Sequence, residues 1–160
     1  MFRLARKFLK PEGGIAAIEL ALVTPIFLML FLSMIELGHM IYYSITVEKA
    51  LRSAVTWVGR NEVLTADVIA STENIARTGQ PTGGEYLVKG WADPIADVQV
   101  SSHQFIDGDI EETVYTVSVS VPYVPVVDML VPALEYLMST SFQEGKYMIV
   151  LTQEQALIGN

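Results

Sequence analysis

The stretch PEGGIAAIELALVTPIFLMLFLSMIELGHM, residues 11–40, decides the architecture of this 160-residue chain. Residues 20–35 contain no ionisable group, and the apolar run extends over residues 15–37 with only Glu19 and Glu36 interrupting it. At about 1.5 Å per residue, a helix of that length spans a bilayer core of roughly 30 Å. We therefore predict a transmembrane helix over residues 15–37.

The composition outside this stretch limits the function classes. Charged residues make up 18% of the chain, against roughly 25% in ordinary globular chains. Four of the ten basic residues precede residue 11, so the rest of the chain is strongly acidic, which argues against nucleic-acid binding. The chain has no cysteine, which excludes disulfides, thiolate zinc sites and a cysteine nucleophile.

The basic residues before the apolar run predict its direction in the membrane. By the positive-inside rule, residues 1–10 lie in the cytoplasm and the acidic domain lies in the periplasm. This predicts a single-pass protein of the bacterial inner membrane. A cleaved secretory signal peptide is the competing interpretation, but the apolar run is too long and no small-x-small cleavage site follows it.

The helical pattern continues beyond the apolar run. Residues 38–60 form an amphipathic continuation, with apolar side chains at spacings of two to four and charged residues between them. We expect one helix over residues 15–59, with Gly59 as its stop. Pro25 lies inside this helix, either as a mild kink or as a weak point that lets the helix stretch during packing.

Glu19 is costly inside a membrane, by roughly 2.5–3.5 kcal/mol on insertion scales. One interpretation is that Glu19 reaches the cytoplasmic interface; the other is a functional role. Gly13 and Gly14 precede it and are expected to interrupt the helix. A basic leader, a glycine, four residues and a glutamate resemble a type IV prepilin leader. This resemblance implies cleavage between Gly14 and Ile15 by a prepilin peptidase, with the apolar helix retained.

Cleavage would create an ammonium group at Ile15, which the membrane also disfavours. Glu19 of one helix can neutralise the new amino terminus of a neighbouring helix, because paired charges cost less than isolated ones in a low dielectric. Such a pair also fixes the axial register between helices. We therefore predict that Glu19 guides docking between subunits, with Ala16, Ala17, Ala21 and Pro25 at the helix-packing surface.

Residues 13–60 also resemble the TadE-like family of tight-adherence (Tad, or Flp) pilus proteins. The matching positions are Ala16, Ala17, Glu19, Pro25, Glu36, Gly38, Tyr42, Tyr43, Ala50, Arg52 and Ala54. Leu20 and His39 depart from the family, which commonly has an aromatic residue and an arginine there. Residues 114–151 are similar to the family's strand, Pro-aromatic step, apolar helix and last strand.

The domain after the long helix is expected to be α+β and pilin-like, with an antiparallel sheet of about three or four strands. In order, the expected elements are a helix over 62–77 capped by Asn61, a loop over 78–85, a strand over 97–106, a turn at Asp107-Gly108, a strand over 111–123 ended by Pro122 and Pro125, a short helix over 126–138, a turn at 144–146 and a strand over 147–152.

Other constellations carry weaker predictions. Four acidic residues, Asp107, Asp109, Glu111 and Glu112, resemble a calcium-binding cluster but lack EF-hand spacing, so a solvated turn is favoured and calcium is left open. His39 is expected at the outer (periplasmic) interface of the inner membrane. Glu36 lies near the outer end, where pairing with a neighbouring subunit and solvent exposure remain open. We find no phosphate loop, nucleophile elbow or dinucleotide fingerprint, and we expect neither enzymatic activity nor a cofactor.

The family resemblance implies a minor pseudopilin of the TadE or TadF type that assembles or primes a Tad (type IVc) pilus. The expected divisions are a leader over 1–14, a transmembrane helix over 15–37, its continuation over 38–60 and an exported domain over 61–160. The resemblance implies a prepilin peptidase, other minor pilins, the major pilin and an inner-membrane platform as partners. The alternatives are an uncleaved, membrane-anchored binding or sensory domain and, less favoured, a periplasmic hydrolase. Whether the protein enters the surface filament is left open.

Overall fold

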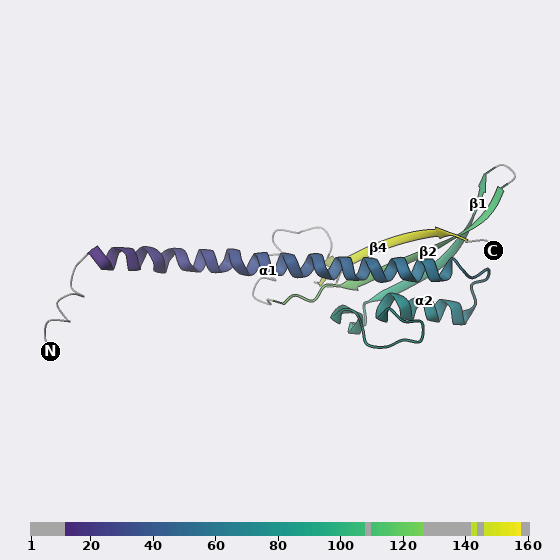
Figure 1. Cartoon of the computed structure of the whole chain (residues 1–160), viewed down its shortest axis with the longest axis horizontal. Coiled ribbons are helices and arrows are strands. Elements are labelled where there is room, and N and C mark those ends of the chain that lie inside the picture. Colours follow the sequence, from purple (N-terminus) through teal and green to yellow (C-terminus); the bar gives the residue numbers. More distant parts are fainter. Residues whose placement is uncertain (1–11, 108–109, 127–141, 144–145, 158–160) are drawn as a thin grey trace. The chain divides into compact units, whose positions relative to one another are not determined.

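The computed structural model describes residues 12–107, 110–126, 142–143 and 146–157 (Figure 1). The chain divides into two compact units, Met1–Gly38 and His39–Asn160. One helix, α1 (Glu12–Val58), contributes to both, and a small antiparallel sheet with a second helix completes the second unit. The predicted α+β class, a long apolar helix followed by a small domain with an antiparallel sheet, is confirmed.

Helix α1 begins three residues earlier than predicted, at Glu12. The expectation that Gly13 and Gly14 interrupt the helix is wrong, because both lie in its first turn. The helix continues through Pro25, which lacks the amide that an ordinary residue would donate to the preceding turn. It ends at Val58, and the Gly59 amide donates to the Val55 carbonyl at 3.0 Å.

The second half of α1 buries the apolar stripe that its sequence predicts. Val47, Leu51, Ala54 and Val58 are almost fully buried and belong to the main hydrophobic core. Outside this stripe Glu48 and Arg52 form an ion pair at 2.6 Å, one helical turn apart. An exposed pair of this kind contributes little to stability, about 0.3–0.5 kcal/mol, so the buried stripe holds this half of the helix in place.

Helix α2 (Ala66–Thr78) is shorter than the predicted helix over 62–77 at its start. Thr65 caps it, because its hydroxyl accepts a hydrogen bond from the Val68 amide at 3.3 Å. The predicted cap, Asn61, is wrong; its side chain instead donates to the carbonyl of Trp57 in α1 at 2.9 Å. Gly79 ends α2 in a left-handed conformation, which glycine adopts without strain.

The sheet contains β1 (Asp97–Asp107), β2 (Ile110–Pro122), β3 (Phe142–Gln143) and β4 (Lys146–Ala156), in the order β1-β2-β4-β3 with antiparallel pairing throughout. Strand β4 extends beyond the predicted end at residue 152. Strand β3 and a 3-10 helix, η2 (Lys89–Ala92), were not predicted. The predicted alternation along β2 is confirmed, since Tyr115, Val117, Val119 and Val121 are buried on one face.

The hydrogen-bond pattern of the sheet explains how proline fits into central strand β2. The Tyr123 amide donates to the Tyr147 carbonyl at 2.7 Å, so odd-numbered residues of β2 direct their backbone groups towards β4. Pro122 therefore faces the β1 side of the sheet, where β1 has already ended, because Asp97 pairs with Ser120. No ladder hydrogen bond is lost at Pro122, which is the condition for proline in a strand.

Several predicted features fall outside the described residues. These are the basic leader over residues 1–10, the residues 108–109 of the acidic turn, the helix over 126–138 apart from Val126, and the turn at 144–146 apart from Lys146. The calcium prediction at the acidic turn therefore stays a prediction.

Candidate functional site

The first half of α1 exposes apolar side chains on all its faces. Every residue from 14 to 31 is exposed, including Leu22 at 70% and Phe27 at 65%. The helix is long and apolar enough to cross a membrane, with a mean hydropathy of 2.4 in its most apolar part. A helix that is apolar all round requires lipid or other helices around it, because water does not stabilise such a surface.

Glu19 is an exposed carboxylate within this apolar surface. Among the described residues it has neither a hydrogen bond nor an ion pair. Ile15 lies four residues earlier and therefore on the same helix face. Side chains of a helix lean towards its N-terminus, so the Glu19 carboxylate is directed along the face that Ile15 begins.

The small residues predicted to pack against neighbouring helices fall on two faces. Ala17, Ala21 and Pro25 follow one another at spacings of four and share one face. Ala16 is three residues before Glu19 and lies on the Glu19 face instead. Ala16, Ala17 and Ala21 are all exposed, so each is accessible to another helix.

Two polar side chains within the apolar half are satisfied by their own helix. The Thr24 hydroxyl donates to the Leu20 carbonyl at 2.6 Å, and the Ser33 hydroxyl donates to the Met29 carbonyl at 2.8 Å. Such bonds remove the cost of placing a hydroxyl in hydrocarbon. Glu19 therefore differs from the other polar groups of this stretch, because its charge finds no partner within the helix.

Glu36 lies near the other end of the apolar half. It is 2% exposed, so the alternative in which solvent covers this side chain is wrong. Its proposed pairing with a neighbouring subunit stays a prediction.

An aromatic cluster at the start of the second unit was missed by sequence reasoning. It consists of His39 and Tyr43 on α1 and Tyr123 just after β2. The rings of Tyr43 and Tyr123 meet edge to face at 5.3 Å, and His39 Nδ1 lies 2.9 Å from the Tyr123 hydroxyl. The cluster packs the end of β2 against one face of α1.

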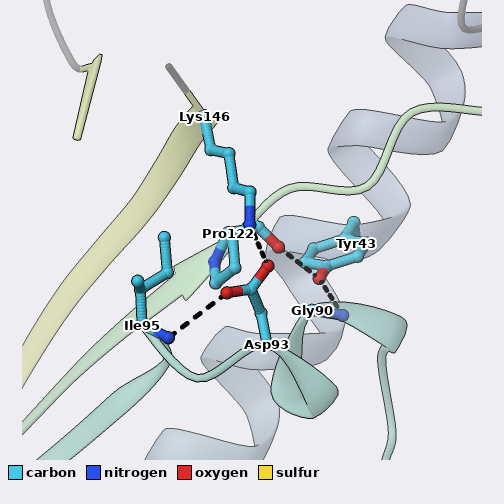
Figure 2. Close-up of polar contacts among 6 residues, drawn as sticks. All are labelled: Tyr43, Gly90, Asp93, Ile95, Pro122 and Lys146. Atoms are coloured by element: carbon cyan, nitrogen blue, oxygen red, sulfur yellow. Dashed lines mark hydrogen bonds and ion pairs between the residues drawn. The ribbon is translucent and has the colours of Figure 1, made fainter. Parts of the chain in front are cut away.

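The Tyr43 hydroxyl connects three elements (Figure 2). It donates to the Pro122 carbonyl at 2.8 Å and accepts from the Gly90 amide of η2 at 2.9 Å. Burial raises the pKa of Tyr43 to about 12, with the Gly90 hydrogen bond opposing part of that rise. A Cβ atom on Gly90 would overlap the Pro122 carbonyl and the Tyr43 hydroxyl, so only glycine permits this close approach.

A second contact attaches the loop after η2 to the sheet (Figure 2). Asp93 forms an ion pair with Lys146, the first residue of β4, and accepts a hydrogen bond from the Ile95 amide at 3.2 Å. The Lys146 ammonium, followed by the Ile95 amide, lowers the pKa of Asp93. The contact helps define where β4 begins.

Comparison with known proteins finds one family that is similar to the N-terminal helical segment of the chain. Residues 14–56 match the family model described as TadE-like protein. The resemblance is confirmed: the chain carries a TadE-like domain, which indicates a protein related to the Tad pilus. No curated protein and no solved structure matches the chain. The match covers the apolar half of α1 and most of its amphipathic continuation, and it begins at Gly14.

Proposed function

We propose that this protein is a minor pseudopilin that assembles or primes a Tad-type pilus after a prepilin peptidase cleaves it between Gly14 and Ile15. The observation that carries the proposal is a TadE-like domain beginning at Gly14, on a fully exposed apolar helix with a carboxylate five residues later. Exposure of every residue from 14 to 31 leaves this helix suited to lipid and to other pilin helices.

Cleavage changes the charge at the start of the helix. Water adds across the Gly14–Ile15 peptide bond, which leaves a carboxylate on Gly14 and an ammonium group on Ile15. Two carboxylates could form an ion pair with that ammonium group. One is Glu19 of the same helix, one turn away, and the other is Glu19 of a neighbouring subunit. Pairing between subunits also sets their axial register, and we assign Glu19 this docking role.

The exposed small residues give the docking helices a close-packing surface. The face formed by Ala17, Ala21 and Pro25 lets a second backbone approach, as small residues do in membrane helix pairs. Ala16 leaves space beside Glu19, where the neighbouring amino terminus would enter. The helix thereby provides both a charge for register and a surface for contact.

The proposal places the protein in the bacterial inner membrane with a cytoplasmic N-terminus and a periplasmic second unit. The partners are a prepilin peptidase, other minor pilins, the major pilin and the inner-membrane assembly platform. The long apolar helix supports the membrane location, and the TadE-like domain supports the pilus partners.

Mass spectrometry of the mature protein, together with one substitution, tests this proposal. We expect Ile15 as the first residue in cells with active prepilin peptidase, and Met1 in cells without it. We expect Glu19→Gln to be inserted and cleaved normally but to abolish surface pili, whereas Glu48→Gln, on the same helix at an exposed position, leaves piliation unchanged.

Two outcomes separate the alternatives. An intact Met1 in cells that process other pilins would instead identify an uncleaved, membrane-anchored binding or sensory domain. Normal piliation of Glu19→Gln would remove the docking role from Glu19 while leaving processing untouched.

A further inference from the structure

Strand β1 forms one edge of the sheet, because the strand order is β1-β2-β4-β3. The pairing of β1 with β2 is continuous from Asp97 opposite Ser120 to Asp107 opposite Ile110, without a bulge. Among the described residues nothing pairs with its outer side, which therefore presents an unbroken row of backbone groups. An edge of this kind is a template for another strand.

The hydrogen-bond pattern shows which residues of β1 face outwards. Odd-numbered residues of β2 bond β4, as the Leu157 amide bonding the Thr113 carbonyl at 2.8 Å also shows. Even-numbered residues of β2 therefore bond β1, and their partners in β1 are odd-numbered. The amides and carbonyls that face outwards belong to Val98, Val100, Ser102, Gln104 and Ile106.

Two devices that often prevent strand addition at a sheet edge are missing from β1. Its sequence, DVQVSSHQFID, contains neither proline nor lysine. All six side chains of residues 101–106 are exposed, including Phe105 at 54% and Ile106 at 67%. The outer half of β1 is thus accessible along its edge and on both faces.

We propose that the outer edge of β1 is a docking site for a β-strand of another protein, one that carries a lysine or arginine opposite each end of β1. The ends of β1 are Asp97 and Asp107, and Glu112 lies on the neighbouring strand opposite Phe105. Opposite charges on paired strands stabilise the pairing, whereas like charges weaken it. The charge of this edge therefore selects a basic partner strand.

The same two aspartates discourage pairing with a second copy of the chain. Two copies of β1 could pair antiparallel along their outer edges with Ser102 of one opposite Ser102 of the other. In this register every residue of β1 has a partner, and the outward-facing residues of the two copies lie opposite one another. That register sets Asp97 of each copy opposite Asp107 of the other, so that residues of like charge occupy opposing positions at both ends. Self-association is disfavoured, and a heterologous strand remains as the occupant.

Two adjacent serines provide a matched test of the edge. Ser102→Pro removes an outward-facing amide, and Ser101→Pro removes an amide that bonds β2. The assay uses the full-length protein in detergent micelles and two synthetic peptides of the length of β1. Both alternate threonine and valine; one has lysine at each end and the other has glutamate.

We expect the lysine peptide to bind about tenfold more tightly than the glutamate peptide, as two cross-strand charge pairs would produce, and to slow hydrogen exchange at the five outward-facing amides. Ser102→Pro should abolish this binding with little change in the melting temperature, and Ser102→Thr should bind normally. Ser101→Pro should lower the melting temperature. Equal binding of the two peptides, or protection elsewhere in the protein, would overturn the proposal.

A charge reversal tests the discrimination against self-pairing. Asp97→Lys sets a lysine of each copy opposite Asp107 of the other, so we expect it to convert monomers into dimers in sedimentation experiments. Adding Ser102→Pro should restore the monomer. Wild-type protein that already dimerises through these amides would show that the occupant is a second copy. Neither experiment depends on cleavage at Gly14 or on Glu19. A negative result for strand docking at β1 would therefore leave the proposed function intact.

Discussion

The two halves of the continuous helix α1 differ in how their apolar side chains are distributed and covered. In the first half, residues 14–31 are exposed on every face and almost all are apolar. In the second half, apolar residues occupy one stripe, and Leu51 and Ala54 on that stripe are fully buried. The first half depends on its surroundings for stability, and the second is stabilised by its own domain. The effects of substitutions in the two halves should therefore be detected by different measurements.

The largest effect should come from Leu51→Ala in the second half. Leu51 is fully buried, so truncation leaves a cavity and should lower the free energy of unfolding by about 2–5 kcal/mol. Leu28→Ala, at an exposed position of the first half, is the matched control and should leave domain unfolding unchanged. Near-UV circular dichroism of the full-length protein in micelles measures both. Equal destabilisation by the two changes would break the distinction between the halves.

Gly90→Ala should have the next largest effect. The added methyl group would overlap the Pro122 carbonyl and the Tyr43 hydroxyl, so η2 must move away from α1, at a cost of about 1–3 kcal/mol. Gly84→Ala meets only ordinary contacts and serves as the control. Thermal unfolding measures both, and a Gly90→Ala protein as stable as its control would show that η2 is free to shift.

Tyr43→Phe should lower the free energy of unfolding by somewhat less, about 1–2 kcal/mol. The ring remains packed, but the Gly90 amide and the Pro122 carbonyl lose their shared partner. Denaturant titration gives the change in unfolding free energy. We expect membrane insertion to be unaffected, since Tyr43 lies outside the apolar half of α1; loss of insertion would contradict this separation.

The smallest effect is a pH dependence. Folded Tyr43 has a pKa of about 12, whereas an unfolded tyrosine has one of about 10, so the folded state retains its proton over a wider range. The contribution to stability is fully present below pH 10 and decreases as the pH rises from about 10 to 12. Comparing wild type with Tyr43→Phe over that range isolates this residue, and parallel pH curves would contradict the assignment.

Elements that depend on local pattern could be predicted from the sequence. The apolar run and its continuation gave one helix, and the alternation along residues 115–121 gave a strand with one buried face. The start of α2 was misjudged because Asn61 and Thr65 are both good capping residues, and only the tertiary fold engages Asn61 elsewhere. Gly13 and Gly14 extend the helix despite their weak propensity, since an end turn costs little.

The aromatic cluster and η2 could not be predicted in the same way. His39 and Tyr123 are 84 positions apart, and the Gly90 amide meets Tyr43 across 47 positions. Sequence spacing shows only that His39 and Tyr43 share a helix face, which is a weak signal by itself. The role of Glu19 is a different case: the sequence pattern identifies it as a candidate, and in the described part of the chain it has no hydrogen-bond or ion-pair partner.

Pro122 has a consequence for the alignment of the β1–β2 hairpin. If β1 lengthened by one further hydrogen-bonded pair, residue 95 would oppose Pro122 and its carbonyl would find no donor. The acceptor on Pro122 is already occupied by the Tyr43 hydroxyl. Pro122 therefore limits the length of the β1–β2 ladder, because pairing beyond Asp97 would leave a backbone carbonyl without a donor.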